Sequence, residues 1–432
     1  GQSGQVSLPS SVTTSGPSGY RFEITGDQVS AVYEIERGLS KQERISSNES
    51  WTVQANQVIK TEYEHGVVET SVYADSDGDG LFQKVSKSYG VSDGSSIKLL
   101  SSSQHGEDGD DQWRGGLVDD DYHGGAGRDS LSGGDGGDDL YGGEGDDSLN
   151  GDRGTDHLYG GDGNDRIFGG SDDDDVSGDE GRDSLLGGDG RDNLDGGNDD
   201  DSLCGDAGAD HLEGAAGNDK LNGGLDADNL HGGDGFDSLD GGAGDDHLIG
   251  DSDSQSDLYA GGSGNDSLDL SNALAPVYVN LATGKLQQLI DGLTVTDRIV
   301  SIEAVIGSDY ADHLTGNSLS DKLDGGLGDD VLEGGRSRDT LSGGEGNDVF
   351  LYRSISDSGI TLLTRDTITD FSRGDRIDLS GIDARSGNNT NDAFQFIGSS
   401  KNLTLSNANG ALWFEQGILY LSLIHISEPT RR

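Results

Sequence analysis

The chain has 432 residues, of which 82 are acidic and 28 are Lys or Arg, so its formal net charge at pH 7 is −54. A surface of this charge repels nucleic acid and anionic membranes, which excludes nucleic-acid binding as a function. Only 30% of the residues are hydrophobic and 74 are Gly, so most of the chain cannot form a conventional globular core, and no apolar run is long enough to predict a transmembrane helix.

The chain contains no Met and opens with Gly1-Gln2-Ser3-Gly4, so we interpret it as an internal fragment of a larger protein with a disordered start over residues 1–19. Residues 20–100 contain short runs with partial period-two alternation, which predict a small antiparallel β-domain. The predicted strands are Tyr20–Thr25, Val29–Glu36, Trp51–Gln54, Val58–Glu64, Val67–Ala74 and Leu81–Ser88.

Three alternate carboxylates in this segment, Asp75, Asp77 and Asp79, are followed by Gly80 and match the first half of an EF-hand loop. The position of the closing bidentate Glu is occupied by Ser86. A weak calcium site and an acidic hairpin turn therefore both remain open.

From Gly106 to Ile249 one nine-residue unit, G-G-x-G-x-D-x-U-x, recurs sixteen times in constant phase. Its glycines permit turns with positive φ, and x-U-x is long enough for a short strand with one inward side chain. Each unit is therefore predicted to form half a coil, and two units a full coil. Stacked strands about 4.8 Å apart would bury a column of Leu, Ile and Val that no single unit could bury alone.

The sixth position is Asp in all sixteen units, and we expect these carboxylates in columns about 5 Å apart on the outside of the turns. Two charges at that distance repel by about 3 kcal/mol at an effective dielectric of about 20, so a cation is needed between them. Calcium accepts carboxylate and carbonyl oxygens in flexible geometry, whereas magnesium requires a strict octahedron and zinc prefers His or Cys.

The units resemble the repeats-in-toxin (RTX) nonapeptide of hemolysin-type proteins over Gly106–Asp269 and Gly307–Leu351. The resemblance implies an all-β fold, a parallel β-roll solenoid in two blocks that binds on the order of a dozen or more Ca²⁺ ions between turns. A disordered Gly/Asp-rich linker would share the composition but not the constant phase.

The predicted ligands are the sixth-position carboxylates and the carbonyls of first- and fourth-position glycines. The carboxylates are Asp129, Asp138, Asp147, Asp156, Asp165, Asp174, Asp183, Asp192, Asp201, Asp210, Asp219, Asp228, Asp237, Asp246, Asp266, Asp312, Asp321, Asp330 and Asp339. The glycines are Gly133, Gly136, Gly142, Gly145, Gly160, Gly163, Gly187, Gly190, Gly241 and Gly244. Asp111, Asp120 and Asp348 are less certain ligands, because a turn at the end of a block lacks a neighbour on one side.

Several units depart from the consensus. Asp replaces Gly at the second position in Asp152, Asp179 and Asp206, and at the fourth in Asp172, Asp199 and Asp226. Because Asp tolerates the left-handed backbone, we expect these turns to survive. Between Gly250 and Ala260 the unit swells to eleven residues.

Residues 270–306 break the repeat with Val277–Leu281 and Ile299–Ile306, which resemble the spacer strands between calcium blocks in RTX proteins. A second block follows over 307–351. Residues 352–420 are similar to the C-terminal β-domain of serralysin-type metalloproteases, on the basis of Asp366–Phe371, Asp375–Ala384 and Ala393–Gly398. Residues 421–432 match the translation of a sequencing adapter, so we exclude them from fold reasoning.

No catalytic motif is supported. None of the nine His residues begins the H-E-x-x-H of a zinc protease, and the G-x-S-x-G at Gly90–Gly94 lacks the helix that a nucleophile elbow requires. Cys204 lies in acidic surroundings that do not activate a thiol. We therefore predict that this part of the protein is not an enzyme and that any catalytic domain lies upstream.

Two functions fit these observations. The first is a calcium-dependent folding and secretion module of a larger extracellular bacterial protein, with type I export implied by the family. The second is a structural or adhesive spacer of a cell-surface or matrix protein that contacts polysaccharide. Aromatic residues on one face would favour the second, and the ninth position supplies Tyr141, Tyr159 and Phe168 as a candidate cluster.

Overall fold

A computed structural model of the chain describes the strands between Gly19 and Ser92, residues 97–106 and 108–290, most of 292–380, and three strands between Gln395 and Ser422. The described residues form strands and turns without a helix, so none of them provides a helix of the length and hydrophobicity that a membrane span requires. The chain divides into two compact units, Gly1–Glu180 and Gly181–Arg432.

The first unit begins with eight strands, two more than the alternation predicts. They are β1 Gly19–Thr25, β2 Gln28–Glu36, β3 Leu39–Glu43, β4 Glu49–Gln54, β5 Gln57–Glu64, β6 Val67–Ala74, β7 Gln83–Ser92 and β8 Ile97–His105. Consecutive strands from β4 to β8 pair antiparallel. Strand β8 also pairs parallel with β10 of the roll, so it joins the antiparallel sheet to the solenoid.

The nonapeptides fold as a parallel β-solenoid of about 13 turns over the repeat region, which confirms the predicted β-roll. In the first unit the strands are β9 Gln112–Arg114, β10 Asp119–Ala126, β11 Ser130–Asp135, β12 Asp139–Glu144, β13 Ser148–Arg153, β14 His157–Asp162, β15 Arg166–Ser171 and β16 Asp175–Glu180. Strands two apart in sequence are paired, as Leu140 with Leu158 on one sheet and Leu131 with Leu149 on the other. A coil is therefore 18 residues, two units, and successive units alternate between two sheets.

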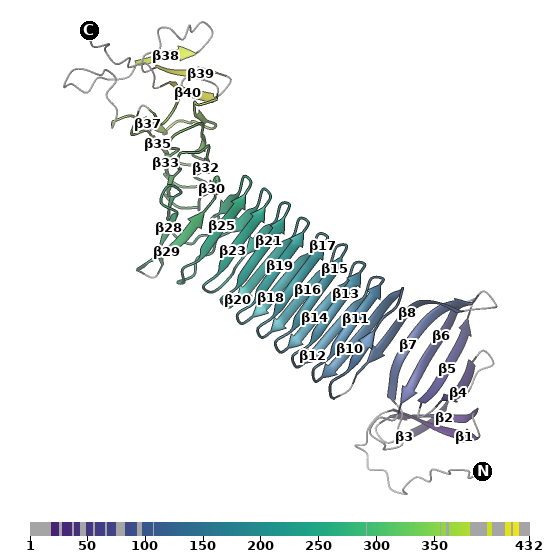
Figure 1. Ribbon diagram of the computed structural model, residues 1–432. Helices are drawn as coiled ribbons and strands as arrows, with labels where there is room; N and C mark the ends of the chain where they lie inside the picture. The colour runs from purple at the N-terminus through teal and green to yellow at the C-terminus, as the bar shows by residue number, and fades with distance from the viewer. Residues whose placement is uncertain are drawn as a thin grey trace. The chain divides into compact units, whose positions relative to one another are not determined.

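The second unit continues the same pattern, and Figure 1 shows its parallel strands stacked coil upon coil. Its strands in the first block are β17 Ser184–Asp189, β18 Asn193–Asn198, β19 Ser202–Ala207, β20 His211–Ala216, β21 Lys220–Leu225, β22 Asn229–His231, β23 Ser238–Ala243, β24 His247–Ile249, β25 Leu258–Ser263 and β26 Ser267–Asp269. At the swollen unit the register lengthens, so that Leu239 pairs with Tyr259 and Leu248 with Leu268.

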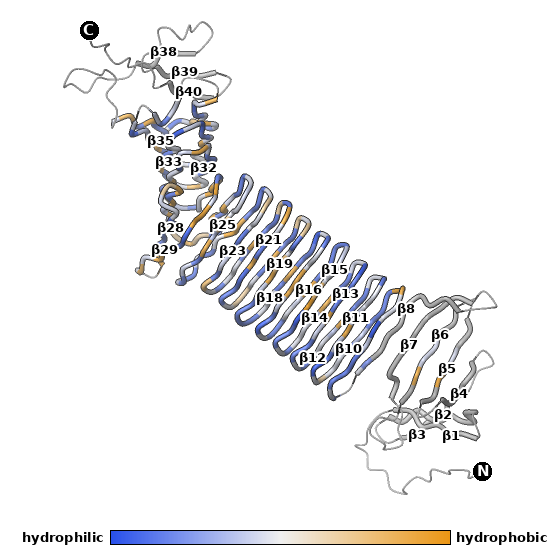
Figure 2. Tube along the Cα trace, in the orientation of Figure 1, coloured by the Kyte–Doolittle hydropathy of each residue, from blue (hydrophilic) through white to orange (hydrophobic). Residues whose placement is uncertain are grey.

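The core is the column of eighth-position side chains. In the first unit these side chains, from Tyr122 to Val176, are at most 2% exposed, and in the second unit the same holds from Leu185 to Leu248 and at Tyr259 and Leu268. Figure 2 shows hydrophobic residues recurring along the strands between hydrophilic turns. Burial of this column is the main apolar contribution to the stability of the roll.

The six Asp residues that replace turn glycines adopt the predicted left-handed backbone. Their φ angles lie between 71° and 80°, in the region where Gly136 and other turn glycines also lie. The short polar side chain of Asp tolerates this region better than most residues, so the substituted turns keep the path of the consensus turn.

Residues 270–306 break the sequence repeat but not the stack of strands. On one sheet β26 pairs with β30 Ala304–Ile306 and β30 with β32 Lys322–Asp324, all parallel. On the other sheet β27 Val277–Asn280, β28 Lys285–Ile290 and β29 Leu293–Val300 form an antiparallel insertion between β25 and β31 His313–Thr315. The segment is therefore part of the roll and not a separate connection.

The second block and the residues after it follow the same two sheets. Besides β31 and β32, its strands are β33 Val331–Glu333, β34 Thr340–Ser342 and β35 Val349–Leu351, and they are extended in parallel by β36 Thr367–Ile368 and β37 Arg376–Asp378. The remaining strands are β38 Gln395–Ser399, β39 Ala411–Glu415 and β40 Ile418–Ser422. Of the suspected adapter segment, Leu421 and Ser422 lie in β40 and the rest lies outside the described residues.

Candidate metal sites

Within each unit the sixth-position carboxylates are arranged in two columns, one at each edge where strand follows turn. In each column Oδ1 accepts a hydrogen bond from the backbone N–H of the sixth-position Asp one coil earlier, as from Asp138 to Asp156 at 2.7 Å and from Asp201 to Asp219 at 2.7 Å. The sequence suggested that these side chains lie on the outside of the turns, but the structure places them inside. Asp138 and Asp156 are 0% exposed, because this hydrogen bond draws each carboxyl under the neighbouring turn.

The second carboxylate oxygen, Oδ2, is buried and has no hydrogen-bond partner at most of these positions. This holds for Asp129, Asp138, Asp147, Asp156, Asp201, Asp219, Asp228, Asp237, Asp246, Asp266, Asp330, Asp339, Asp348 and Asp366. A buried carboxylate oxygen without a donor costs several kcal/mol. The arrangement therefore requires either protonation or a cation at each such oxygen.

The surroundings of Oδ2 consist of backbone oxygen and glycine. A Cβ added to Gly142 would meet Oδ2 of Asp147 and, at 2.5 Å, the carbonyl oxygen of Gly160 in the next coil. The same contacts recur at Gly160 and Gly241, so first-position glycine leaves a cradle between a carboxylate and a carbonyl of successive turns. This donor set of hard oxygens fits Ca²⁺, and no His or Cys is part of the repeated pattern.

Burial raises the pKa of these carboxyls far above their ordinary value. The pKa of Asp138 rises to about 7 and that of Asp201 to about 8, first because burial disfavours the charge and also because neighbouring Asp residues repel it. In the second block the same causes raise the pKa of Asp330 to about 8. A divalent cation would reverse this shift by stabilising the ionised form.

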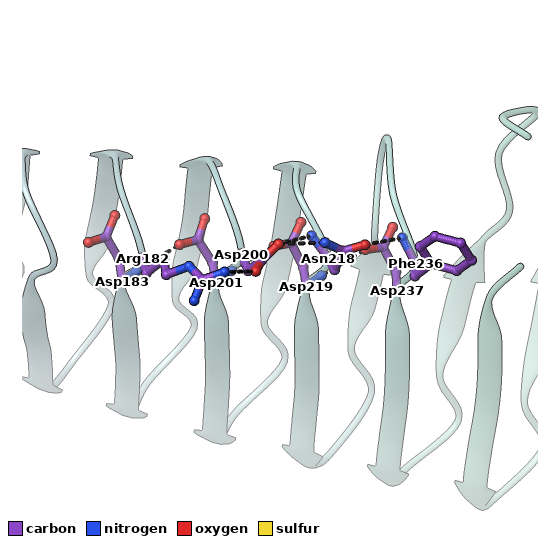
Figure 3. Close-up of polar contacts among 8 residues, drawn as sticks. All are labelled: Arg182, Asp183, Asp200, Asp201, Asn218, Asp219, Phe236 and Asp237. Carbon is purple, nitrogen blue, oxygen red and sulfur yellow. Dashed lines mark hydrogen bonds and ion pairs between the residues drawn. The ribbon is translucent and has the colours of Figure 1, made fainter. Parts of the chain in front are cut away.

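The fifth-position residues next to this column form a second ladder of hydrogen bonds, in which a carboxyl pKa is lowered and not raised. Figure 3 shows Arg182 donating to Asp200, Asn218 donating to Asp200, and the backbone N–H of Phe236 donating to Asn218, beside the parallel carboxylates of the sixth-position column. The hydrogen bonds from Asn218 lower the pKa of exposed Asp200. This ladder is solvated and already satisfied, so its carboxylates are not candidate ligands.

The glycines predicted as ligands occupy two distinct places in the turn. The first-position residues Gly133, Gly142, Gly160, Gly187 and Gly241 lie against Oδ2 of the Asp in the same unit. Of the fourth-position residues, Gly136, Gly145 and Gly163 have φ between 128° and 146°, whereas Gly190 and Gly244 lie outside the positive range.

Of the three residues predicted to lie at the ends of the blocks, Asp111, Asp120 and Asp348, not all lie at the end of a column. Asp120 is 4% exposed and Asp111 is half-buried. The expectation that Asp348 lacks a neighbour is wrong, because it accepts from Asp330 at 3.1 Å and donates to Asp375 at 3.1 Å. The column continues past the last nonapeptide through the strand pairing of β35 with β37. Asp75, Asp77 and Asp79 lie outside the described residues.

Sequence reasoning missed five acidic residues that occupy the same place in the columns. They are Asp257, Asp297, Glu303, Asp366 and Asp375, each of which accepts a hydrogen bond from the backbone of the preceding column member. The signal that could have identified them is the end of the unit alone, an acidic residue followed by x-U-x, as in Asp297-Arg298-Ile299-Val300 and Glu303-Ala304-Val305-Ile306. None of their turns carries the complete G-G-x-G set, which hid them from a search for the whole motif.

At Asp312 and Asp321, the first carboxylates of the second block, the pattern changes. Both oxygens of Asp312 accept hydrogen bonds from Ser308, so this predicted ligand is already satisfied. Asp321 accepts at Oδ2 from Asn317 and leaves Oδ1 without a partner. The two residues thus differ from Asp330 and Asp339 of the same block, whose unpartnered oxygen is Oδ2.

The predicted aromatic cluster is divided between the two sheets. Tyr141 and Tyr159 stack at 5.0 Å on β12 and β14, whereas Phe168 lies on β15 of the other sheet. The stack continues instead through His123 and His105, with centroid distances of 4.4 Å at each step. Residues 18 apart lie side by side in the roll and residues nine apart do not, which the alternation of units explains.

Comparison with known families agrees with this geometry. Residues between 114 and 228 match the RTX calcium-binding nonapeptide repeat, and residues 229–416 match the family described as Peptidase M10 serralysin C terminal. No curated protein matches the chain. The chain thus carries RTX calcium-binding repeats and a serralysin-type C-terminal domain, both of which are non-catalytic and imply a calcium-binding module of a type I secreted protein.

Proposed function

We propose that this chain, with its RTX repeats and serralysin-type C-terminal domain, is a calcium-operated folding module of a secreted protein. In this proposal the sixth-position carboxylates bind Ca²⁺ together with turn carbonyls, and the roll closes only where calcium is abundant. The observation that carries the proposal is the row of buried Oδ2 atoms without hydrogen-bond partners, several of which, such as that of Asp147, lie beside a glycine carbonyl of the adjacent coil.

Mass action gives the size of the stabilisation that bound calcium would supply. Extracellular calcium modules have dissociation constants of about 10⁻⁴–10⁻³ M, so at about 2 mM calcium each site stabilises the roll by about 0.6–1.8 kcal/mol. At submicromolar calcium the contribution is close to zero. With on the order of a dozen sites, the summed contribution of calcium is comparable to the free energy of unfolding of a whole domain, about 5–15 kcal/mol.

Export follows from this switch. Inside the cell the chain would stay open, because the charge of −54 opposes collapse when no cation binds between the turns. An open chain can pass a one-step export channel, and the roll would form after release into the extracellular medium. The matched families support export of this type, and the channel itself is part of the proposal.

A calcium titration of the full chain tests the proposal. Far-UV circular dichroism should show a cooperative change from coil to β-structure near millimolar calcium, and magnesium at the same concentrations should not produce it. A chain that is fully β-structured in chelator at neutral pH would refute the calcium switch. It would favour a permanent structural or adhesive spacer.

For that second function the stacked row of His105, His123, Tyr141 and Tyr159 is the relevant observation. Sugars pack against ring faces, and in this row each ring covers the face of the next. The row therefore gives weak support for a polysaccharide site, and we propose the calcium switch.

A further inference from the structure

The unit between Gly250 and Ala260 departs from every other unit of the first block. The step between Asp237 and Asp257 is 20 residues instead of 18, and Asp251 and Asp253 stand where the unit has its second and fourth glycines. Elsewhere Asp at these positions adopts positive φ, as at Asp152, but neither Asp251 nor Asp253 does. The two extra residues thus give the backbone another path, on which these side chains lie at the turn.

Three carboxylates converge on this coil. One oxygen each from Asp251, Asp253 and Asp257 lies within 4.8 Å of the others. Asp253 is held by the N–H groups of Gly235 and Gln255, both at 2.8 Å. The geometry is therefore built by hydrogen bonds from the preceding coil and is not a loose acidic surface.

Asp257 is fixed in the same way. It is 5% exposed, and it accepts from the N–H of Asp237 at 2.9 Å and from the hydroxyl of Tyr259 at 3.2 Å. Tyr259 is an eighth-position core residue, 2% exposed, whose hydroxyl reaches this turn. The core of the roll therefore supports the cluster directly.

A fourth carboxylate, from the preceding coil, has a buried oxygen without a hydrogen-bond partner. Asp237 is 4% exposed, and its Oδ2 has no hydrogen-bond partner. It belongs to the turn that Asp253 and Asp257 contact, through the N–H groups of Gly235 and of Asp237 itself. Among the described residues, no ion pair neutralises any of these four carboxylates.

We propose that Asp251, Asp253 and Asp257 bind one Ca²⁺ through their side chains, with Oδ2 of Asp237 as the neighbouring acidic oxygen. Calcium–oxygen distances of 2.3–2.6 Å allow ligands to lie up to about 5 Å apart across the ion, which matches the separation of these oxygens. The site differs from the predicted repeat sites, which combine a sixth-position carboxylate with carbonyls of first- and fourth-position glycines.

The higher ligand charge predicts tighter binding. Three or four carboxylates on a preformed turn should bind calcium at least about tenfold more tightly than a turn built mainly from carbonyls. The site is also linked to the inserted hairpin: Asp257 donates to Asp297 of β29 at 3.2 Å, and Gln288 of β28 donates to the carbonyl of Asp251 at 3.1 Å. Its occupation should stabilise the end of the first block before the other turns fill.

Terbium luminescence with the full chain tests this site, because Tyr259 lies close enough to sensitise a bound Tb³⁺. The parent chain should show one tight sensitised binding step, and Asp251→Asn should abolish it and remove one equivalent of tightly bound Ca²⁺ in equilibrium dialysis. Tyr259→Phe should keep that Ca²⁺ equivalent but lose most of the sensitised emission.

Asp245→Asn is the matched control, since Asp245 lies one turn away, is exposed and accepts from Asn265. It should leave both readouts unchanged. Circular dichroism at saturating calcium separates the two proposals, because Asp251→Asn should still fold through the repeat turns. An Asp251→Asn chain that retains the tight step, or a Tyr259→Phe chain with undiminished emission in that step, would overturn the site.

Discussion

Without calcium, the roll should be more stable in mild acid than at neutral pH. The perturbation is chelation followed by a change of pH from 8 to 5. Burial raises the pKa of Asp138 from the ordinary 3.8 to about 7. Since the folded state holds this proton more tightly than the unfolded state, its stabilising contribution is complete below about pH 3.8 and is lost as the pH rises through about 7.

The magnitude for one such carboxyl is large. A difference of about three pH units corresponds to about 4 kcal/mol at neutral pH, and a whole domain is stabilised by about 5–15 kcal/mol. Two ionised residues of this kind would be enough to unfold a typical domain. Asp201 and Asp330, whose pKa values rise to about 8, carry the same argument into the second unit.

Far-UV circular dichroism of the full chain in chelator measures the effect. The β-signal should be larger at pH 5 than at pH 8, and millimolar calcium should restore it at pH 8. Sedimentation at each pH controls for aggregation, because the isoelectric point is about 4.1. Replacing Asp138 and Asp201 by Asn should flatten the pH dependence. Equal β-signals at pH 5 and pH 8 in chelator would refute the assignment of the pKa shifts to burial.

Three further predictions follow from the same geometry. Gly142→Ala should reduce the free energy of unfolding in calcium by at least about 2 kcal/mol, because the new Cβ meets carbonyl and carboxylate oxygens. Gly116→Ala is the control: its Cβ meets nothing within 4 Å, so it should cost less than about 1 kcal/mol in the same denaturant titration. Asp156→Asn should stabilise the chelated chain and raise the calcium concentration at the folding midpoint, since burial raises the Asp156 pKa to about 6; effects of equal sign in chelator and calcium would contradict this. Cys204 should react with iodoacetamide at pH 8 about 100-fold more slowly in the folded chain than in urea, because burial and then Asp206 raise its pKa to about 11, and equal rates would show that the thiol is not shielded.

Much of the fold could be read from the repeat. The constant phase of Gly, Asp and an apolar eighth residue is enough to predict a coil of two units, an inward column from Tyr122 to Leu248, and left-handed turns even where Asp152 or Asp172 replaces glycine. These features are local, because each depends on the backbone preferences and side-chain direction of a single unit.

The orientation of the carboxylates depends on contacts with residues in a neighbouring coil and could not be predicted from a single unit. Whether Asp138 faces solvent or the next turn depends on the N–H of Asp120 one coil earlier, and that contact exists only in the stack. The same is true of the acidic residues missed in sequence, such as Asp297 and Glu303, which enter the columns through pairing of β29 and β30 with strands far away in the chain.

The sequence by itself thus determined the solenoid, its core and the chemistry of its turns, because a nine-residue unit repeated in phase admits one way of burying its apolar residue. Only the tertiary structure decided which oxygens are buried without a partner, which aromatic rings meet, and that the swollen coil brings Asp251, Asp253 and Asp257 together. The first two depend on contacts between residues 18 positions apart, which stacking sets and composition does not, and the third depends on the path that the longer unit takes through its turn.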